Sequence, residues 1–567
     1  MLKTLLSNIM GATLSQQSAV DTVNQWRSRP RHELIFDSGL GEIRQYFQAI
    51  DKLHDANARG SNDRLLATAA DRLRSEFDAV LRRAAAALPA STTEWSSSVS
   101  DSTANAFRFE DYLAGAGAGD AVSPDAADFL KNVAARLNFR GKIEDCVRVY
   151  KSVRKPQLQS QLKRLRFDEL RGDFHNQRRF IQDELKVKME LWIQISKICV
   201  KILFEREKKL CDQIFGDVDA AAADDCFIGT VKDSAVLLFR FAEDLSQRNQ
   251  PHHTMGAVLA VYDAFLWVLP GAEALFASAP GKGVRDVCSQ AHSLIRDDAV
   301  RMQYELQHDI LHDAAASDDR GGVHPTTNFV VGQIEVVVKN KDLLTGLIRS
   351  APSLNFGDTA VPDEELRQYA SNNGFLEQYL VLTVIVLLRN LDKKSRSYED
   401  PCLGHLFTMN NLRSVLKAIE ASPDLQEMVG GRLITKMSDD LASARVSYET
   451  TTCEKFLTCL RRDGIYTSRC CFRSRPSKAA VKRRLNSFNE VYKRVDELHS
   501  LWKIPDLQLR NEVRHRMSEI LVPRYRKFIE EFGNKPETRL LVEGNMKHRP
   551  EELEALVQQR LFANSDS

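Results

Sequence analysis

The sequence predicts an all-α protein made of stacked antiparallel helical bundles, and three observations lead to this fold class. Apolar residues recur at three- and four-residue steps along most of the chain, as on the buried face of a helix. Strand-like alternation is nearly absent, and the one Asn-Gly pair, Asn373-Gly374, lies within a helical pattern. Successive helices joined by short loops bury their faces on one another, so we expect an elongated rod.

Composition and periodicity divide the chain into three regions. Residues 1–88 form a short N-terminal helical region, in which Tyr46, Phe47 and Ile50 begin an apolar stripe. Residues 89–126 are rich in Ser, Thr, Gly and Ala with little periodicity, which is typical of a flexible linker or long loop. Residues 127–562 form the helical rod, with 461–562 as its basic C-terminal bundle.

Helical patterns follow one another beyond the linker. An amphipathic stripe covers 187–204, and Val330–Lys339 is predicted to be helical despite its β-branched residues. The further helices are predicted at 230–247, 254–269, 282–312, 325–350, 364–391, 404–420, 431–461, 479–502 and 506–532. Breaks between helices are expected at Gly216, Pro251, Pro270, Gly321, Gly322, Pro352, Pro423 and Pro476.

Composition and motifs exclude several functional classes. Ten cysteines in 567 residues, mostly inside apolar patterns, indicate reduced thiols, and no Cys/His grouping has zinc spacing. No nucleophile, phosphate-loop or paired-carboxylate motif occurs, and the isolated His324 and His405 are expected to be a helix cap or interior histidines. We therefore expect no enzyme activity, no metal and no cofactor.

Membrane contact is expected to be peripheral. No run of about 18 uncharged apolar residues is present, and the nearest one, Tyr379–Leu388, is far shorter. The N-terminal segment MLKTLLSNIM has one lysine and a broken apolar run, so a signal peptide is not predicted.

The strongest functional signal is a basic stretch near the C-terminus. No acidic residue occurs between Gly464 and Asn489, whereas seven basic ones do: Arg469, Arg473, Arg475, Lys478, Lys482, Arg483 and Arg484. Residues 461–549 carry 22 Lys and Arg against 11 Asp and Glu, a balance of +11 in a chain of net charge +2. Such asymmetry is typical of a surface that meets a polyanion.

Two interpretations of this stretch stay open on residue chemistry alone. The basic cluster precedes an amphipathic helix, and a helix start offers free N–H groups and a positive dipole end to phosphate. Alternatively, the stretch is an ordinary solvated helix face. The neighbouring Cys470 and Cys471 are candidates for S-acylation, with plain exposed or packed thiols as the alternative.

Several segments together resemble one protein family, the seventy-kilodalton subunit of the exocyst in its plant form. They include IFDSGLGEIRQYFQAID from Ile35, VHPTTNFVV from Val323, and LEQYLVLTVIVLLRNLDKKSRSYEDPCLGHLFTMNNLRSVL from Leu376. SKAAVKRRLNSFN from Ser477 and KIPDLQLRNEVRHRMSEILVPRYRKFIEEFG from Lys503 complete the likeness, which covers roughly residues 33 to 562. The resemblance implies a cullin-repeat-like rod of helical bundles.

The resemblance also implies a function and its residues. Members tether secretory vesicles to the plasma membrane as part of a complex with other exocyst subunits, so we expect a cytoplasmic protein recruited peripherally to that membrane. Their C-terminal domain binds phosphatidylinositol 4,5-bisphosphate through basic residues. The matching positions here are Lys478, Lys482 and Arg484, with Lys547 in a later segment as a weaker match. Arg483 strengthens this patch, and Arg473 and Arg475 precede it in the same basic stretch.

A second function stays open beside tethering. Only about 30 residues precede the segment at Ile35, fewer than the resemblance leads us to expect. This favours an exocyst-independent scaffold in plant immunity or specialised trafficking, with Rho-family GTPases, immune receptors or pathogen effectors as possible partners. Nucleic-acid binding is not expected, because no DNA- or RNA-binding motif accompanies the basic stretch.

Overall fold

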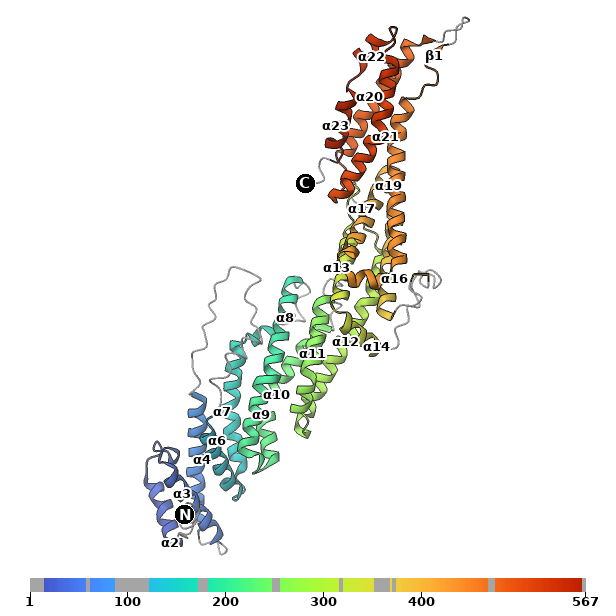
Figure 1. The fold of residues 1–567 in the computed structure, drawn as a ribbon. Coiled ribbons are helices and arrows are strands. Elements are labelled where there is room, and N and C mark those ends of the chain that lie inside the picture. Colours follow the sequence, from blue (N-terminus) through green and yellow to red (C-terminus); the bar gives the residue numbers. More distant parts are fainter. Residues whose placement is uncertain are drawn as a thin grey trace, which may run out of the picture. The chain divides into compact units, whose positions relative to one another are not determined.

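The computed structural model describes residues 15–57, 62–86, 122–171, 182–246, 255–315, 320–350, 368–369, 374–467 and 475–562. Contacts divide the chain into two compact units, Met1–Ala299 and Val300–Ser567. Helices dominate both units, as Figure 1 shows, so the prediction of an all-α fold is confirmed. The one sheet in the described residues is a pair of two-residue strands.

Antiparallel helices make up the first unit. Their order is α2 (Gln16–Ser28), η1 (Ile35–Asp37), α3 (Leu40–Asp55), α4 (Asp63–Ala86), α6 (Pro124–Asn138), α7 (Ile143–Arg164), η2 (Phe167–Arg171), α8 (Gln182–Ile198), η3 (Cys199–Phe204), α9 (Glu205–Cys211), η4 (Asp212–Gly216), α10 (Ala220–Ser246), α11 (Met255–Leu275) and η6 (Ala279–Gly281). The long helix α12 (Lys282–His312) passes into the second unit. The segments η3 and η4 are π-helical turns on either side of α9.

The second unit consists of helices and one two-stranded hairpin. Its order is α13 (Pro325–Lys339), α14 (Lys341–Ser350), α16 (Phe375–Ser395), α17 (Pro401–Glu420), α18 (Pro423–Val429), α19 (Gly431–Cys459), β1 (Tyr466–Thr467), β2 (Arg475–Pro476), α20 (Lys478–His499), α21 (Leu507–Gly533), α22 (Arg539–Asn545) and α23 (Pro550–Arg560). The strands pair antiparallel, with Tyr466 opposite Pro476. No pattern in the sequence predicts this hairpin.

Several helices begin at a short polar side chain that caps the first turn. The side chain of Ser477 accepts a hydrogen bond from the backbone N–H of Ala480, and Asp506 accepts one from Leu509. His324 is also a cap, because its Nδ1 accepts from the N–H of Thr326. The prediction that His324 is a cap or interior histidine is therefore confirmed.

Several boundary predictions differ from the structure; the helix predicted at 364–391, for example, is α16 and begins only at Phe375. Pro270 was expected to break a helix, but α11 continues through it to Leu275, so that prediction is wrong. The predicted helix 325–350 is two helices, because Asn340 interrupts the pattern between α13 and α14. The predicted linker 89–126 lies mainly outside the described residues, and its last three residues belong to α6. The proposed domain boundaries otherwise stay predictions.

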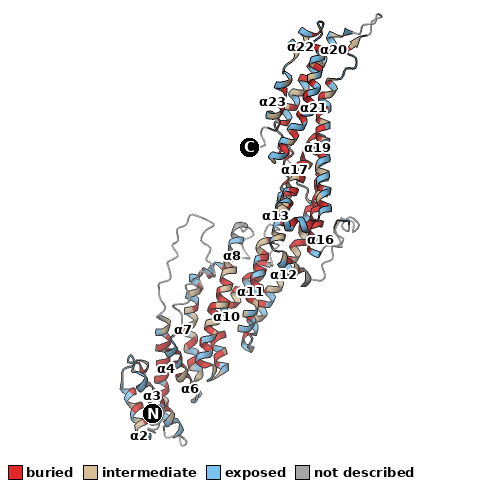
Figure 2. Ribbon diagram, viewed as in Figure 1, coloured by how far each residue is buried: buried red, intermediate tan, exposed pale blue. Residues whose placement is uncertain are grey.

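One helix was not anticipated as a membrane-length segment. Helix α11 is long and apolar enough to cross a bilayer, with a mean hydropathy of 1.5 over its best window. Half of that window is buried in the first unit, where Phe265 packs near Trp192 with ring centroids 4.8 Å apart. We therefore interpret α11 as a core helix. Figure 2 shows the buried and exposed faces that alternate around the helices.

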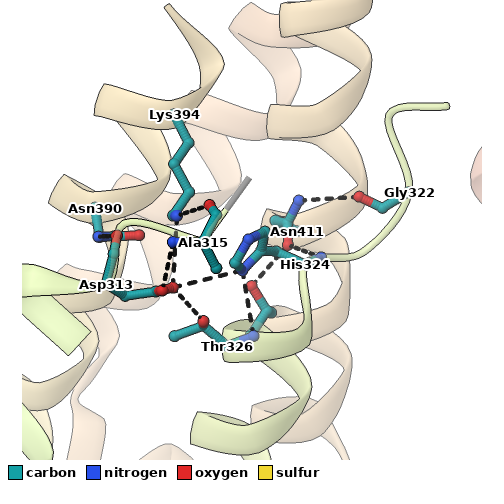
Figure 3. Close-up of polar contacts among 9 residues, drawn as sticks. Asp313, Ala315, Gly322, His324, Thr326, Asn390, Lys394 and Asn411 are labelled. Atoms are coloured by element: carbon teal, nitrogen blue, oxygen red, sulfur yellow. Dashed lines mark hydrogen bonds and ion pairs between the residues drawn. The ribbon is translucent and has the colours of Figure 1, made fainter. Parts of the chain in front are cut away.

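A buried polar network fastens the loop before α13 to α16 and α17. Asp313 lies 3.5 Å from the Lys394 amino group and accepts a hydrogen bond from Thr326, as Figure 3 shows. The Asn411 side chain accepts from the His324 N–H at 2.8 Å and donates to the Gly322 carbonyl. This loop carries part of VHPTTNFVV and the asparagine belongs to LFTMNNL, so both sequence blocks have a structural role.

Candidate functional site

The first two turns of α20 present the basic surface predicted from the sequence. Val481 and Leu485 are buried against Phe528, Phe532 and other residues of a small apolar cluster. Since positions 478, 482 and 483 lie on the other side of the helix, Lys478, Lys482 and Arg483 are exposed. The same helix start leaves backbone N–H groups and a positive dipole end beside these side chains. We call Lys478, Lys482 and Arg483 the α20 basic surface.

The charges of the α20 basic surface are not neutralised by described residues. Neither lysine, nor Arg483, forms an ion pair or hydrogen bond with any residue in the described ranges. Many other cations of the chain are paired; Arg462, for example, lies 2.6 Å from a Glu531 oxygen. Three uncompensated charges within two helical turns favour an anionic ligand.

Arg484 has a different role from its neighbours. Its guanidinium donates hydrogen bonds of 3.0 Å to the backbone carbonyls of Thr458 and Asp463. Thr458 lies in the last turn of α19, whose terminal carbonyls have no partner within the helix. The half-buried side chain thus fastens the end of α19 to α20 and is less available to a ligand than its exposed neighbours.

The remaining predicted residues are distributed around this surface. Arg475 is exposed in β2, three residues before Lys478. Lys547 is exposed after α22, whose end is held against the middle of α20 by a 3.0 Å hydrogen bond from Asn489 to the Asn545 carbonyl. Asn489 is about 16 Å along the helix from Lys478. Lys547 is therefore outside the first turns of α20.

Three further predicted residues cannot be placed. Arg473, Cys470 and Cys471 lie outside the described residues, between the two strands of the hairpin. The proposals that Arg473 contacts lipid and that either cysteine is acylated stay predictions.

The structure adds a cation that sequence reasoning missed. Lys535, just after α21, donates a 2.7 Å hydrogen bond to the Tyr466 hydroxyl and lies 4.6 Å from the centre of its ring. Tyr466 in turn donates to Glu531, so the hairpin is anchored to the end of α21. Figure 1 shows the hairpin, α22 and the start of α20 at the same end of the second unit. Lys535 is 57 positions from Lys478, so no local pattern links them.

The described residues contain no metal-binding group and no activated cysteine or histidine that would indicate catalysis. Within those ranges, no group of three or more His, Cys, Asp or Glu side chains is placed to hold a metal ion. Burial raises the pKa of the Cys146 and Cys453 thiols to about 12, so both stay protonated and poorly nucleophilic. His405 is similarly unsuited to accept a proton at neutral pH, because burial lowers its pKa.

The chain is similar to known proteins in sequence. The family model that describes the C-terminal part of the Exo70 subunit of the exocyst complex matches residues 190–559. The exocyst complex component EXO70C2 of Arabidopsis thaliana is 25% identical over 445 residues, covering 78% of this chain and 61% of the relative. The component EXO70A1 of the same plant is 25% identical over 434 residues, covering 76% and 65%.

The family model, together with the match to one solved structure, establishes the family and the fold of the chain. The chain spans about three fifths of the length of EXO70C2. A structure of Exo70 from S. cerevisiae aligns with a TM-score of 0.50 over 96% of this chain and 99% of the yeast chain, at 12% identity, which shows a shared fold. The relatives are named as components of a complex, in agreement with the expectation that this chain is not an enzyme. Because the family model covers well over half of its length, the chain belongs to the Exo70 family of exocyst complex subunits.

Proposed function

We propose that this chain acts as an exocyst subunit that tethers secretory vesicles to the plasma membrane, and that the α20 basic surface binds phosphoinositide headgroups there. The observation that carries the proposal is the set of three exposed cations, Lys478, Lys482 and Arg483, without described acidic partners at a helix start. Family membership supports the place of the chain in the complex.

The binding free energy that the α20 basic surface can contribute at a membrane is small. A basic side chain near an anionic bilayer contributes about 1 kcal/mol, so three contribute roughly 3 kcal/mol. This is weaker than a millimolar dissociation constant, which corresponds to about 4 kcal/mol. The chain therefore needs a second contact, which assembly with other exocyst subunits would supply by raising the effective concentration at the membrane. On this proposal the protein is cytoplasmic and reaches the membrane peripherally.

Vesicle binding by charge-reversed variants tests the lipid contact. The triple variant Lys478→Glu, Lys482→Glu, Arg483→Glu is compared with a control variant Lys339→Glu, Lys393→Glu, Arg494→Glu. The control changes the net charge equally at exposed positions away from the start of α20. Vesicles containing phosphatidylinositol 4,5-bisphosphate, and vesicles with the same charge from phosphatidylserine, separate headgroup recognition from general attraction.

Co-purification tests the place of the chain in the complex. The full chain is recovered from its own cells, and the other exocyst subunits are measured in the same fraction. We expect them in stoichiometric amounts. Their absence from a stable, folded chain would contradict the tethering role while leaving the lipid contact to be judged by the vesicle experiment.

A further inference from the structure

The first unit carries an exposed apolar stripe that neither family membership nor the α20 basic surface explains. It consists of the outward residues of α11, namely Leu266, Trp267, Pro270 and Ala274. Leu266 is 43% exposed and Trp267 is 41% exposed. Pro270 lies four residues after Leu266 and three after Trp267, and Ala274 lies four residues further on, so the set spans about 12 Å, or two helical turns. We call these four residues the α11 stripe.

Two lysines line one edge of the α11 stripe. The amino groups of Lys197 in α8 and Lys201 in η3 lie 5.5 and 5.2 Å from the centre of the Trp267 ring. Neither amino group forms an ion pair with a carboxylate in the described ranges. The indole attracts both cations, but a ring face does not neutralise their charge.

The backbone of α11 fixes one of these lysines in place. A Cβ atom at Gly271 would lie 3.1 Å from Val200 Cγ1 and 3.3 Å from Lys201 Nζ. The missing side chain therefore lets η3 pack against α11 and lets Lys201 lie across it toward Trp267. The position of Lys201 beside the α11 stripe therefore depends on the close packing of η3 against α11 at Gly271.

The opposite edge of the α11 stripe is acidic. Glu273 faces α12, where its charge raises the pKa of Cys288 and opposes the lowering of the pKa of His292. Asp263 is exposed one turn before Trp267, at the N-terminal end of the α11 stripe and in line with it. An anionic bilayer would meet two carboxylates together with two lysines, so it would gain little net attraction. A partner protein with negative charge on one edge only can place that edge beside Lys197 and Lys201 and keep it away from the like charge of Glu273.

We propose that the α11 stripe binds an amphipathic helix of a partner protein whose apolar residues are bordered on one edge by Asp or Glu. Two turns of apolar surface match anchors at i, i+3 or i+4, and i+7 of such a helix. Its acidic edge pairs with Lys197 and Lys201, which sets the direction of the bound helix. This inference goes beyond the proposed function and does not depend on it.

Binding of a defined probe to the full chain tests this proposal. The probe is a fluorescein-labelled helical peptide of about 18 residues with a leucine stripe and glutamates on one edge, followed by fluorescence anisotropy. We expect Lys197→Glu with Lys201→Glu to weaken its binding about tenfold. We expect Leu266→Ser and Gly271→Ala each to weaken it as well. The control Lys186→Glu with Lys232→Glu, at exposed positions of α8 and α10, should bind as the wild type does.

A charge-swapped probe makes the test reciprocal. When lysines replace the glutamates of the peptide, it should bind the Lys197→Glu, Lys201→Glu variant better than the wild type. Equal binding of both peptides to the wild type, or no saturable binding of the glutamate peptide, would overturn the proposal. It would also be overturned if phosphatidylserine vesicles bound through the same lysines.

Discussion

Arg484 Nη1 lies 3.0 Å from the carbonyl oxygen of Thr458, in the last turn of α19, and donates a hydrogen bond to it. The Arg484 side chain thus stabilises the contact between α19 and α20, whereas Lys482 and Arg483 are exposed to solvent. A cation at a helix C-terminus also interacts favourably with the helix dipole. One basic run therefore contains two kinds of residue, those that hold helices together and those available to a ligand.

Replacing Arg484 and Lys482 separately should distinguish these roles. Arg484→Ala removes two hydrogen bonds to backbone carbonyls and should lower the free energy of unfolding by about 1 kcal/mol, a value reduced for solvent exposure. Lys482→Ala should change it by less than about 0.5 kcal/mol, as is usual at the surface. Urea unfolding followed by circular dichroism measures both. Equal effects would show that Arg484 does not fasten α19.

The buried carboxylate of Glu207 should be essential to the first unit. It accepts a 2.7 Å hydrogen bond from the Tyr150 hydroxyl and forms a 2.7 Å ion pair with Arg154. Glu207→Ala leaves the arginine charge without its partner and should cost about 3 to 5 kcal/mol of unfolding free energy. Replacing both partners, Arg154→Met with Glu207→Leu, should recover most of the loss. If the double variant is no more stable than Glu207→Ala, the penalty does not come from the stranded arginine.

Asn411 should have a comparable role in the second unit. Its fully buried side chain accepts from the His324 N–H at 2.8 Å and from the Thr327 hydroxyl at 2.6 Å. Asn411→Ala leaves both donors buried without that acceptor and should lower the unfolding free energy by roughly 2 to 4 kcal/mol. The expected signature is a lower midpoint of thermal unfolding. An unchanged midpoint would mean that the loop before α13 does not depend on this side chain.

Acid should destabilise the protein through His499. Burial, reinforced by Lys455, lowers the pKa of its imidazole to about 3 despite the opposing charge of Asp400. The Tyr448 hydroxyl lies 2.9 Å from its Nδ1, and the Trp502 ring stacks on it with centroids 4.1 Å apart.

The direction of the pH effect follows from where the proton binds. The unfolded chain takes up the proton below its ordinary pKa of about 6.5, whereas the folded chain does not until about pH 3. Stability from His499 is therefore complete above pH 6.5 and is lost as the pH falls toward 3. Between pH 7 and 5 the loss should be about 2 kcal/mol. His499→Gln should remove that part of the pH dependence, and urea unfolding at both pH values measures it. An identical loss in the variant would contradict this origin.

The sequence predicted most helices because their apolar periodicity is local. It failed at Pro270, where the ring lies on the exposed side of α11 and the helix continues through it. It also grouped Arg484 with Lys478 and Lys482, since only the fold reveals that the carbonyl of Thr458 lies within reach.

Residues far apart in sequence were similarly beyond prediction. Lys535 meets Tyr466 across 69 positions, and Lys201 meets Trp267 across 66. Such contacts depend on how helices pack, which no local pattern encodes. The family resemblance, by contrast, needed only linear segments such as LFTMNNL, and the family assignment is confirmed.

Vesicle cosedimentation of the full chain at about 10 mM accessible lipid, where a contact of roughly 3 kcal/mol is at least half saturated, tests the central claim most directly. We predict that the wild type and the control variant at Lys339, Lys393 and Arg494 bind vesicles containing phosphatidylinositol 4,5-bisphosphate. The triple variant Lys478→Glu, Lys482→Glu, Arg483→Glu should reduce this binding about tenfold or more without changing the unfolding midpoint. Unchanged binding by a folded triple variant would contradict the claim that the start of α20 meets the membrane.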